Sequence, residues 1–169
     1  MKLYISGPMT GVPQYNFPAF DAAATYARAQ GYEVINPAEE DGQDVREDCM
    51  DSPTGTEEIG QTWGEALSRD VKTLADGNIQ GILLLRHWGE SWGSMLEVMI
   101  GLKKGMKFFV LLTDEMSVRE QVLMRTFGGE GRIIPVPAGL IGQSLGIAVA
   151  MKAEDVAQLD TIAAGRTVH

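Results

Sequence analysis

Short apolar runs alternate with stretches of helical periodicity along most of the chain. The apolar runs predict five strands, at Lys2–Ser6, Glu33–Ile35, Gly81–Leu85, Lys107–Leu112 and Arg132–Val136. Apolar residues at helical spacing predict helices at Phe17–Gln30, Thr62–Ala75, Trp92–Lys104, Val118–Met124, Gln143–Ala150 and Lys152–Ala164. Repeated strand–helix units favour one α/β domain over residues 1–169. We expect a three-layer α/β/α sandwich with a central, mainly parallel five-stranded sheet, flavodoxin-like or Rossmann-like in organisation.

Turn-forming residues mark the boundaries of the first helix. Asn16 stands in the capping position, Pro18 in the first turn, and Gly31 just past the end. The strand at Gly81–Leu85 is apolar throughout, as expected of a parallel strand that is buried on both faces.

Residues 38–60 are strongly polar, with nine acidic residues and a single basic one, Arg46. Loops of this length in compact domains are usually functional or disordered. We therefore expect an acidic loop at about 38–60. Its more interesting interpretation is a lid that covers a binding site, with Arg46 in contact with a phosphate group of the ligand. A divalent-metal loop is a second interpretation, although the spacing does not fit a calcium loop. Its carboxylates would be Asp41, Asp44, Asp48 and Asp51.

Residues 91–97, Ser-Trp-Gly-Ser-Met-Leu-Glu, are the strongest candidates for chemistry. They follow a predicted strand and open a helix, and ligands of open α/β sheets bind beyond the carboxyl ends of strands. The helix N-terminus, with Ser91, Gly93 and Ser94, would suit an anion such as a phosphate. Glu97 lies within about two helical turns of that point. In the alternative interpretation Ser91 only caps the helix and Glu97 is solvated.

The chain begins with a strand that runs directly into a loop containing glycine and proline. Gly7 and Gly11 permit a close approach of the backbone to a ligand, and Pro8 and Met9 lie between them. Two loops of ligand-binding composition thus leave the same edge of the predicted sheet. We expect Gly7, Pro8 and Met9 to contact a ligand. The alternative is an ordinary turn between strand and helix.

Four short motifs follow one another along the chain: Tyr4-x-x-Gly7-Pro8, Asn36-Pro37, Arg69-Asp70 and Ser91-x-Gly93-x-x-x-Glu97. Together they resemble the nucleoside 2-deoxyribosyltransferase-like superfamily. The Gly-Pro-Met-Thr-Gly start, followed by Asn-Phe-Pro-Ala-Phe at residues 16–20, is similar to small uncharacterised members that are often found in bacteriophage genomes. The resemblance covers roughly residues 1–112.

The resemblance implies a mechanism and a role for three residues. In the superfamily a glutamate attacks the anomeric carbon of a deoxyribosyl group, the base leaves, and water or a second base takes the sugar. By position, Glu97 is that nucleophile, Tyr4 orients it, and Asp70 contacts the sugar or assists departure of the base. No cofactor is expected.

The resemblance also favours a nucleotide over a nucleoside. Relatives that act on free nucleosides carry an aspartate where this chain has Ser91. Relatives that hydrolyse deoxynucleoside 5′-monophosphates carry a serine there and use it on the phosphate. Members commonly complete each site with residues from a neighbouring subunit, so we expect a homo-oligomer, with a role in it for a C-terminal extension from about residue 114.

The chemistry is also reasonable on the residues alone. Cleavage of an N-glycosidic bond develops oxocarbenium character at the sugar, which a carboxylate such as Glu97 can stabilise or trap. The departing base needs a proton or a hydrogen-bond donor, a role for a second carboxyl with a raised pKa. Asp70 is the candidate. The alternative places it on a helix surface, paired with Arg69 or Lys72.

Two residues in the loop after the third strand are further candidates for ligand contacts. His87 could hydrogen-bond a substrate, and the indole of Trp88 could stack on a nucleobase. Packing of the tryptophan against the sheet edge or a neighbouring subunit is the alternative. Because the chain has only two histidines, a His-rich metal site is excluded, and we expect no metal.

Charge and composition narrow the class of partner. A formal net charge of −9 disfavours a nucleic-acid polymer, whereas a single small nucleotide or nucleoside needs few donors. Cys49 is the only cysteine, so no intrachain disulfide can form. No apolar run approaches the ~20 residues of a membrane span. We expect a cytoplasmic protein, in the host cytoplasm if it is phage-encoded, without a membrane partner.

Two functions of different classes remain. One is an enzyme that cleaves or transfers at the N-glycosidic bond of a (deoxy)nucleoside 5′-monophosphate through Glu97. The other is a non-catalytic nucleotide-binding or regulatory module on the same fold. The enzyme carries a geometric prediction, because Tyr4 must then lie within roughly 2.5–3.0 Å of the Glu97 carboxylate.

Overall fold

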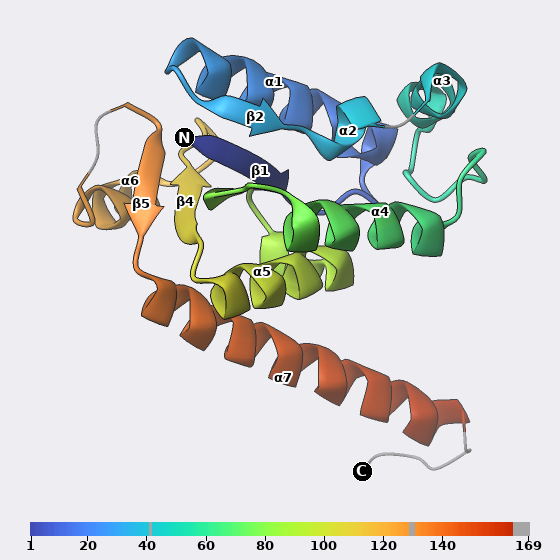
Figure 1. Ribbon diagram of the computed structural model, residues 1–169. Coiled ribbons are helices and arrows are strands. Elements are labelled where there is room, and N and C mark those ends of the chain that lie inside the picture. Colours follow the sequence, from blue (N-terminus) through green and yellow to red (C-terminus); the bar gives the residue numbers. More distant parts are fainter. Residues whose placement is uncertain (41, 129–130, 164–169) are drawn as a thin grey trace.

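A five-stranded sheet forms the centre of the protein in the computed structural model (Figure 1). The strands β1 (Lys2–Ser6), β2 (Glu33–Ile35), β3 (Gly81–Leu84), β4 (Lys107–Leu111) and β5 (Ile133–Val136) lie in the order β2-β1-β3-β4-β5. The first four are parallel and β5 is antiparallel to β4. The predicted α/β class and the mainly parallel five-stranded sheet are confirmed. The backbone is described over residues 1–40, 42–128 and 131–163, and the side chains as far as residue 152.

Helices cover both faces of this sheet, an arrangement consistent with a three-layer α/β/α fold (Figure 1). The long helices are α1 (Phe17–Ala29), α4 (Trp63–Asp76), α5 (Trp92–Lys104) and α7 (Ala138–Ala163). The short ones are η1 (Pro13–Asn16), α2 (Pro37–Glu40), α3 (Gln43–Asp51), η2 (Trp88–Glu90) and α6 (Val118–Arg125). Helix α1 packs on one face, and α4, α5 and α7 pack on the other.

Alternation along β1 decides which side chains meet which helices. Leu3 and Ile5 are fully buried in the core under α1, where Phe20 also lies. Tyr4 faces the other way, into the core beneath α4 and α5 with Met95. A functional side chain on the Tyr4 face of β1 is therefore placed against α5.

The predicted boundaries of the first helix are confirmed at Asn16, Pro18 and Gly31. Pro18 occupies the first turn of α1, and Gly31 has a φ of +83°, the left-handed conformation that favours glycine. Asn16 precedes the helix but makes no capping bond. Its own backbone is left-handed, with a φ of 60°, and its amide Nδ2 donates to the carbonyl of Pro8 over 2.8 Å instead.

The expectation of a loop at 38–60 is wrong for its first half, which forms α2 and α3. The residues of α3 include good helix formers, and an acidic residue in its first turn suits the helix dipole. Val45 and Cys49, four residues apart, form its apolar stripe and pack toward the core beside α1. Two apolar residues among so many acidic ones are too weak a pattern to predict a helix from the sequence.

The expectation of two C-terminal helices is also wrong, because α7 continues without a break for 26 residues. Met151 and Lys152, where the break was expected, are both good helix formers, so nothing stops the helix there. Ala164, the expected last residue, lies outside the described residues. Among the described helices, none combines the length and the apolar character needed to cross a bilayer.

Candidate functional site

Two hydrogen bonds from β1 hold the carboxyl group of Glu97. Tyr4 Oη donates to Glu97 Oε1 over 2.9 Å, and Ser6 Oγ donates to Glu97 Oε2 over 2.5 Å. Tyr4 and Ser6 stand two residues apart on the strand and therefore point to the same face. Glu97 is only 6% exposed. The predicted Tyr4–Glu97 contact is confirmed, and the alternative of a solvated Glu97 is wrong.

Close packing of α5 on the sheet brings Glu97 within reach of β1. Gly101 follows Glu97 by one helical turn, and a Cβ there would lie 2.6 Å from Ile82 Cδ1 on β3. The absence of a side chain at Gly101 favours this close approach of the helix to the strands. Since β1 is an inner strand paired on both sides, the hydroxyl groups that meet Glu97 are carried by a rigid element.

The environment of Glu97 favours its neutral form overall. Burial raises the pKa of the Glu97 carboxyl to about 8, opposed by the hydrogen bond from Ser6 and reinforced by the nearby charge of Asp70. The hydrogen bond from Tyr4 also lowers this pKa, as its geometry predicts, but burial outweighs it. Burial and the charge of Glu97 together raise the pKa of the Tyr4 phenol well above its usual value, so the phenol stays a donor.

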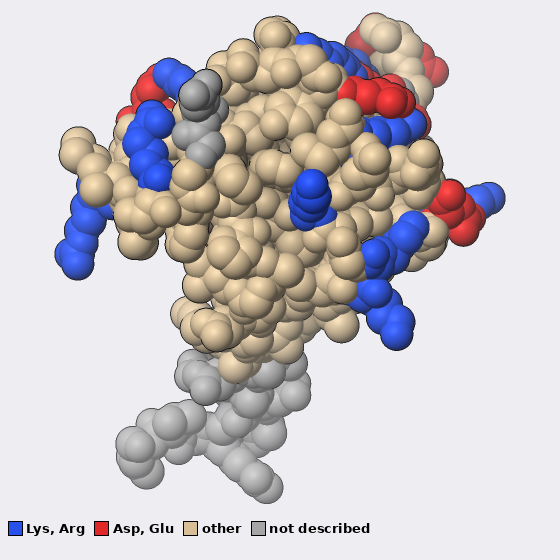
Figure 2. All heavy atoms as spheres, turned by 60° about the vertical axis from the view of Figure 1, so that its left-hand side comes forward, with Lys and Arg blue, Asp and Glu red and all other residues tan. Residues whose placement is uncertain are grey.

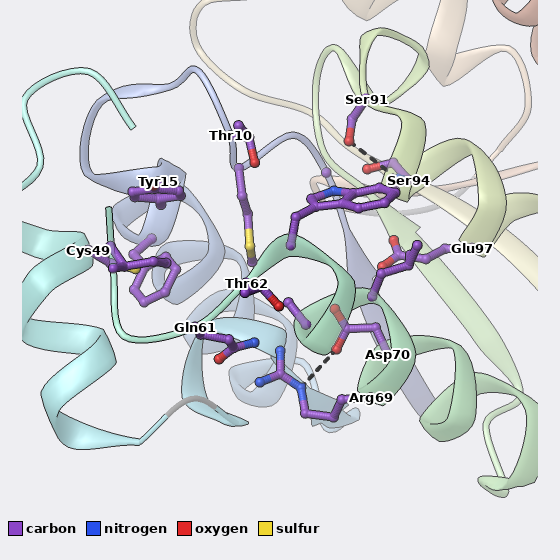
Figure 3. A pocket seen from close by; sticks show the side chains of 18 of the residues that line it. Thr10, Tyr15, Cys49, Gln61, Thr62, Arg69, Asp70, Ser91, Ser94 and Glu97 are labelled. Atoms are coloured by element: carbon purple, nitrogen blue, oxygen red, sulfur yellow. Dashed lines mark hydrogen bonds and ion pairs between the residues drawn. The ribbon is translucent and has the colours of Figure 1, made fainter. Parts of the chain in front are cut away.

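A pocket of about 460 Å³ lies in front of Glu97 (Figure 3), a size typical of small-molecule sites. The predicted site residues that line it are Gly7, Met9, Asp70, Ser91, Gly93, Ser94 and Glu97. In Figure 3 Ser91, Ser94, Glu97 and Asp70 lie along one side, and Tyr15 and Cys49 lie across from them. Polar groups from α4 and α5 thus face a more apolar wall that also contains Phe17 and Ile59.

Asp70 lies on α4 in the pocket wall, largely buried. Arg69 Nε donates to Asp70 Oδ1 over 3.1 Å, so the alternative of an ion pair between these neighbours is confirmed. The alternative of a surface position is wrong, because Asp70 faces the pocket and its charge acts on Glu97. Asp70 and Glu97 therefore lie in the wall of the same pocket.

The N-terminus of α5 forms the polar end of the pocket. Ser91 is its capping residue, and Ser91 Oγ accepts from the backbone N–H of Ser94 over 3.4 Å. Capping uses a lone pair of Ser91 Oγ and leaves its O–H free to donate. Ser94 Oγ is buried and has no hydrogen-bond partner among the described residues. A buried hydroxyl in this state costs stability unless a ligand or water completes it.

Three predicted contact residues do not line this pocket. Pro8 and His87 line a second pocket of about 920 Å³, on the other side of the loop after β1. His87 Nδ1 lies 2.7 Å from Glu90 Oε1 in a left-handed turn that leads into η2. Trp88 packs against the core beneath α7, as the packing alternative predicted.

Ser6 and an aromatic wall were missed by the sequence analysis. Alternation along β1 could have found Ser6, since it shares a face with Tyr4. Tyr15 lies in η1, just before α1, and Phe17 is the first residue of α1. The sequence analysis considered this region only for the boundary of the helix. Trp63 matched the apolar spacing of α4, yet it is 56% exposed and lines the pocket.

The second half of the acidic segment forms one wall of the pocket. Gly11 N donates to Gly55 O over 2.9 Å, and Tyr15 Oη donates to Glu57 O over 2.6 Å. These bonds fix the segment to the loop after β1. Arg46 does not reach the pocket, because its guanidinium pairs with Asp21 and donates to the carbonyl of Ala38. The expected contact of Arg46 with a phosphate is therefore wrong.

No metal site is formed by the described residues, since no group of three or more His, Cys, Asp or Glu is suitably placed. Asp44, Asp48 and Asp51 of the divalent-metal interpretation lie on α3. Asp41 lies outside the described residues.

The burial of Glu97 predicts a pH dependence of stability. The pKa of the Glu97 carboxyl is about 8 in the folded protein, against an ordinary value of 4.5 for an exposed glutamate. Between these two pH values the folded protein therefore keeps a proton on Glu97 that the unfolded chain has lost. Its contribution is fully present below about pH 4.5 and is lost as pH rises toward 8. Glu97→Gln removes this loss, and at pH 8 it should be more stable than the parent by on the order of a few kcal/mol.

Urea unfolding of both proteins at pH 5 and pH 8 measures this difference. The advantage of Glu97→Gln should be small at pH 5 and larger at pH 8. Glu40→Gln is the matched control at an exposed position, where a substitution should change the free energy of unfolding little. An equal effect of Glu97→Gln at both pH values would contradict the raised pKa.

The whole of this site falls within a span shared with other proteins. The model of a protein family described as "Domain of unknown function (DUF4406)" matches residues 1–110, from β1 into β4. No curated protein and no solved structure matches the chain. Because the matched span covers well over half of the 169 residues, the chain belongs to the DUF4406 family.

Proposed function

We propose that this protein cleaves or transfers at the N-glycosidic bond of a deoxynucleoside 5′-monophosphate, with Glu97 as nucleophile. The observation that carries the proposal is the buried Glu97 carboxyl, held on both oxygens by Tyr4 and Ser6 at the wall of a pocket. A carboxyl fixed in this way has little reorganisation to undergo when it attacks a carbon. No cofactor or metal takes part in the proposed reaction.

The fold supports membership of the nucleoside 2-deoxyribosyltransferase-like superfamily. The strand order β2-β1-β3-β4-β5 is that of flavodoxin-like proteins, which bind ligands at the switch point between β1 and β3. The pocket lies at this point, between the loop after β1 and the N-terminus of α5. The antiparallel β5 is a departure from a fully parallel sheet, and β3 and β4 lie between it and β1.

The two ends of the pocket suit the two ends of a nucleotide. The N-terminus of α5, with Ser91 and the unpartnered Ser94 Oγ, offers donors and partial positive charge to a phosphate. Ser91 and Glu97 are six residues apart, about 9 Å along the helix, which leaves room for a sugar between phosphate and nucleophile. The aromatic side chains of Tyr15, Phe17 and Trp63 provide an apolar surface for a base.

The proposed reaction has two steps. In the first, the proton of Glu97 passes by way of the Asp70 carboxylate to the base, a carboxylate oxygen of Glu97 bonds to the anomeric carbon, and the bond from that carbon to the base nitrogen breaks. Water or a second base then attacks the same carbon and releases Glu97, with its surplus proton returning to Asp70. Attack requires ionised Glu97. With a pKa of about 8, roughly one tenth of the molecules carry it at pH 7 before ligand binds.

A non-catalytic nucleotide-binding module remains the second candidate. The observation that favours it is the raised pKa of Glu97, since a neutral carboxyl is a poor nucleophile. The two candidates differ in whether free base appears when the protein is incubated with deoxynucleotides.

The first functional prediction concerns Glu97→Gln. The amide keeps the shape of the side chain but cannot act as an anionic nucleophile, so release of free base should fall by about 10³-fold or more while nucleotide binding persists. Chromatography of base release and calorimetric binding of the same deoxynucleotide measure the two effects. Turnover at the parent rate would remove Glu97 from the mechanism.

The second concerns Ser91→Ala. If Ser91 bonds the phosphate, the variant should lose about 1.5–3 kcal/mol of affinity for a monophosphate and much less for the matching nucleoside. Comparing the two ligands within one variant cancels the loss of the helix cap, which affects both. Equal losses would instead mark Ser91 as a cap alone.

We also propose that the protein is a homo-oligomer that associates through α7. Residues 138–151 contain no charged side chain, and α7 exposes Leu140, Ile147 and Met151 on one face. Figure 2 shows an uncharged surface next to the grey C-terminal residues on the face in view. Copies with a net charge of −9 repel one another, so an uncharged apolar face is where a second copy can approach most easily.

The third functional prediction tests this association. Ile147→Asp should dissociate the oligomer, because it places a charge in the apolar contact of each copy. Val122→Asp on α6 is the matched control, since Val122 is 60% exposed and Ile147 is 64% exposed. Sedimentation velocity should show a lower mass for Ile147→Asp only. A parent protein that sediments as a monomer at high concentration would overturn the proposal.

A further inference from the structure

Ser6 is a buried hydroxyl with one evident hydrogen-bonding role. Ser6 is the last residue of β1 and has no exposed surface. The three residues before it, Leu3, Tyr4 and Ile5, are also fully buried. The O–H of Ser6 donates to Glu97 Oε2. A methyl or a thiol would fill this position with less need for a partner, so the hydroxyl is explained by the carboxyl it meets.

The two donors to Glu97 are not equivalent. The bond from Ser6 measures 2.5 Å and the bond from Tyr4 measures 2.9 Å. Among hydrogen bonds to one carboxyl group, the shorter bond is the stronger and holds its oxygen more firmly. Ser6 is also fixed by its place on an inner strand, where its backbone pairs in register with Leu84.

We propose that Ser6 is the principal positioning residue of Glu97: its short hydrogen bond from an inner strand fixes Oε2 more firmly than Tyr4 fixes Oε1. The catalytic consequence rests on the proposed function, whereas the effect on ionisation does not. Sequence motifs point only to Tyr4 for this task.

Among the groups around Glu97, Ser6 lowers the pKa of the carboxyl most. Burial and the charge of Asp70 on α4 raise the pKa of Glu97, and Tyr4 on β1 lowers it less than Ser6 does. Arg69 on α4 pairs with Asp70. Loss of Ser6 should therefore move the pKa of Glu97 upward from about 8 by more than loss of Tyr4.

The test compares Ser6→Ala, Ser6→Cys and Tyr4→Phe with the parent. Titration of the Glu97 side-chain carboxyl by ¹³C NMR, with the signal assigned by its absence in Glu97→Gln, measures ionisation without any substrate. We expect the largest upward shift for Ser6→Ala and a smaller one for Tyr4→Phe. Ser6→Cys keeps a weak donor of similar size and should fall between Ser6→Ala and the parent, which keeps the test valid if Ser6→Ala fails to fold.

Kinetics supply the second arm. With a deoxynucleoside monophosphate, Ser6→Ala should lower kcat at pH 7 by about 10- to 100-fold, leave KM within about twofold, and recover activity toward high pH. Ser117→Ala is the matched control, because Ser117 also donates to a glutamate, Glu120, but on the surface of α6. It should leave the pH profile unchanged.

The outcomes separate the two proposals. Equal or smaller shifts for Ser6→Ala than for Tyr4→Phe overturn the role of Ser6, whatever the activity. Absence of base release from the parent overturns the proposed function, and the NMR titration still decides the role of Ser6. A fall in kcat with an unshifted pH profile marks Ser6 as a packing residue only and also overturns its role.

Discussion

The burial of one carboxyl group is the constraint on which the site depends. Glu97 is removed from water by the packing of α5 on the sheet, and an isolated buried carboxylate is strongly disfavoured. Two hydroxyl groups from β1 reduce that cost, one on each carboxyl oxygen. The balance leaves the pKa of Glu97 near 8, a value that keeps both protonation states accessible close to neutral pH.

This arrangement requires a close fit between helix and strand. Gly101 allows α5 to approach β3, and the alternation of β1 sends Tyr4 and Ser6 toward α5 while Leu3 and Ile5 fill the opposite core. The same approach places the N-terminus of α5 at the carboxyl edge of the sheet. The buried Glu97 carboxyl and the polar end of the pocket are therefore parts of one helix, held at a fixed separation.

The rest of the pocket comes from segments far apart in sequence. The loop after β1 and the chain around Gly55 are joined by backbone hydrogen bonds, and together they carry the apolar wall opposite Glu97. The apolar wall is attached to β1 through the loop that follows this strand, and the opposite wall is carried by helices that pack on the same sheet. The sheet therefore sets the position of both walls of the pocket. A ligand between them meets donors at one end, a carboxyl pair in the middle and aromatic side chains at the other.

The sequence by itself determined the five strands and four of the helices to within one residue, because period-two and period-3.6 patterns report directly on burial. The Tyr4–Glu97 contact was expected from the family resemblance, not from these patterns. The sequence did not determine α2 and α3, whose short apolar stripe is hidden among acidic residues, or the continuity of α7. Only the tertiary structure decided that Ser6 shares the task of Tyr4, that Arg46 is committed to Asp21, and that Pro8, His87 and Trp88 do not line the pocket. Local patterns specify which face a residue takes, whereas the partner it meets there depends on how distant elements pack.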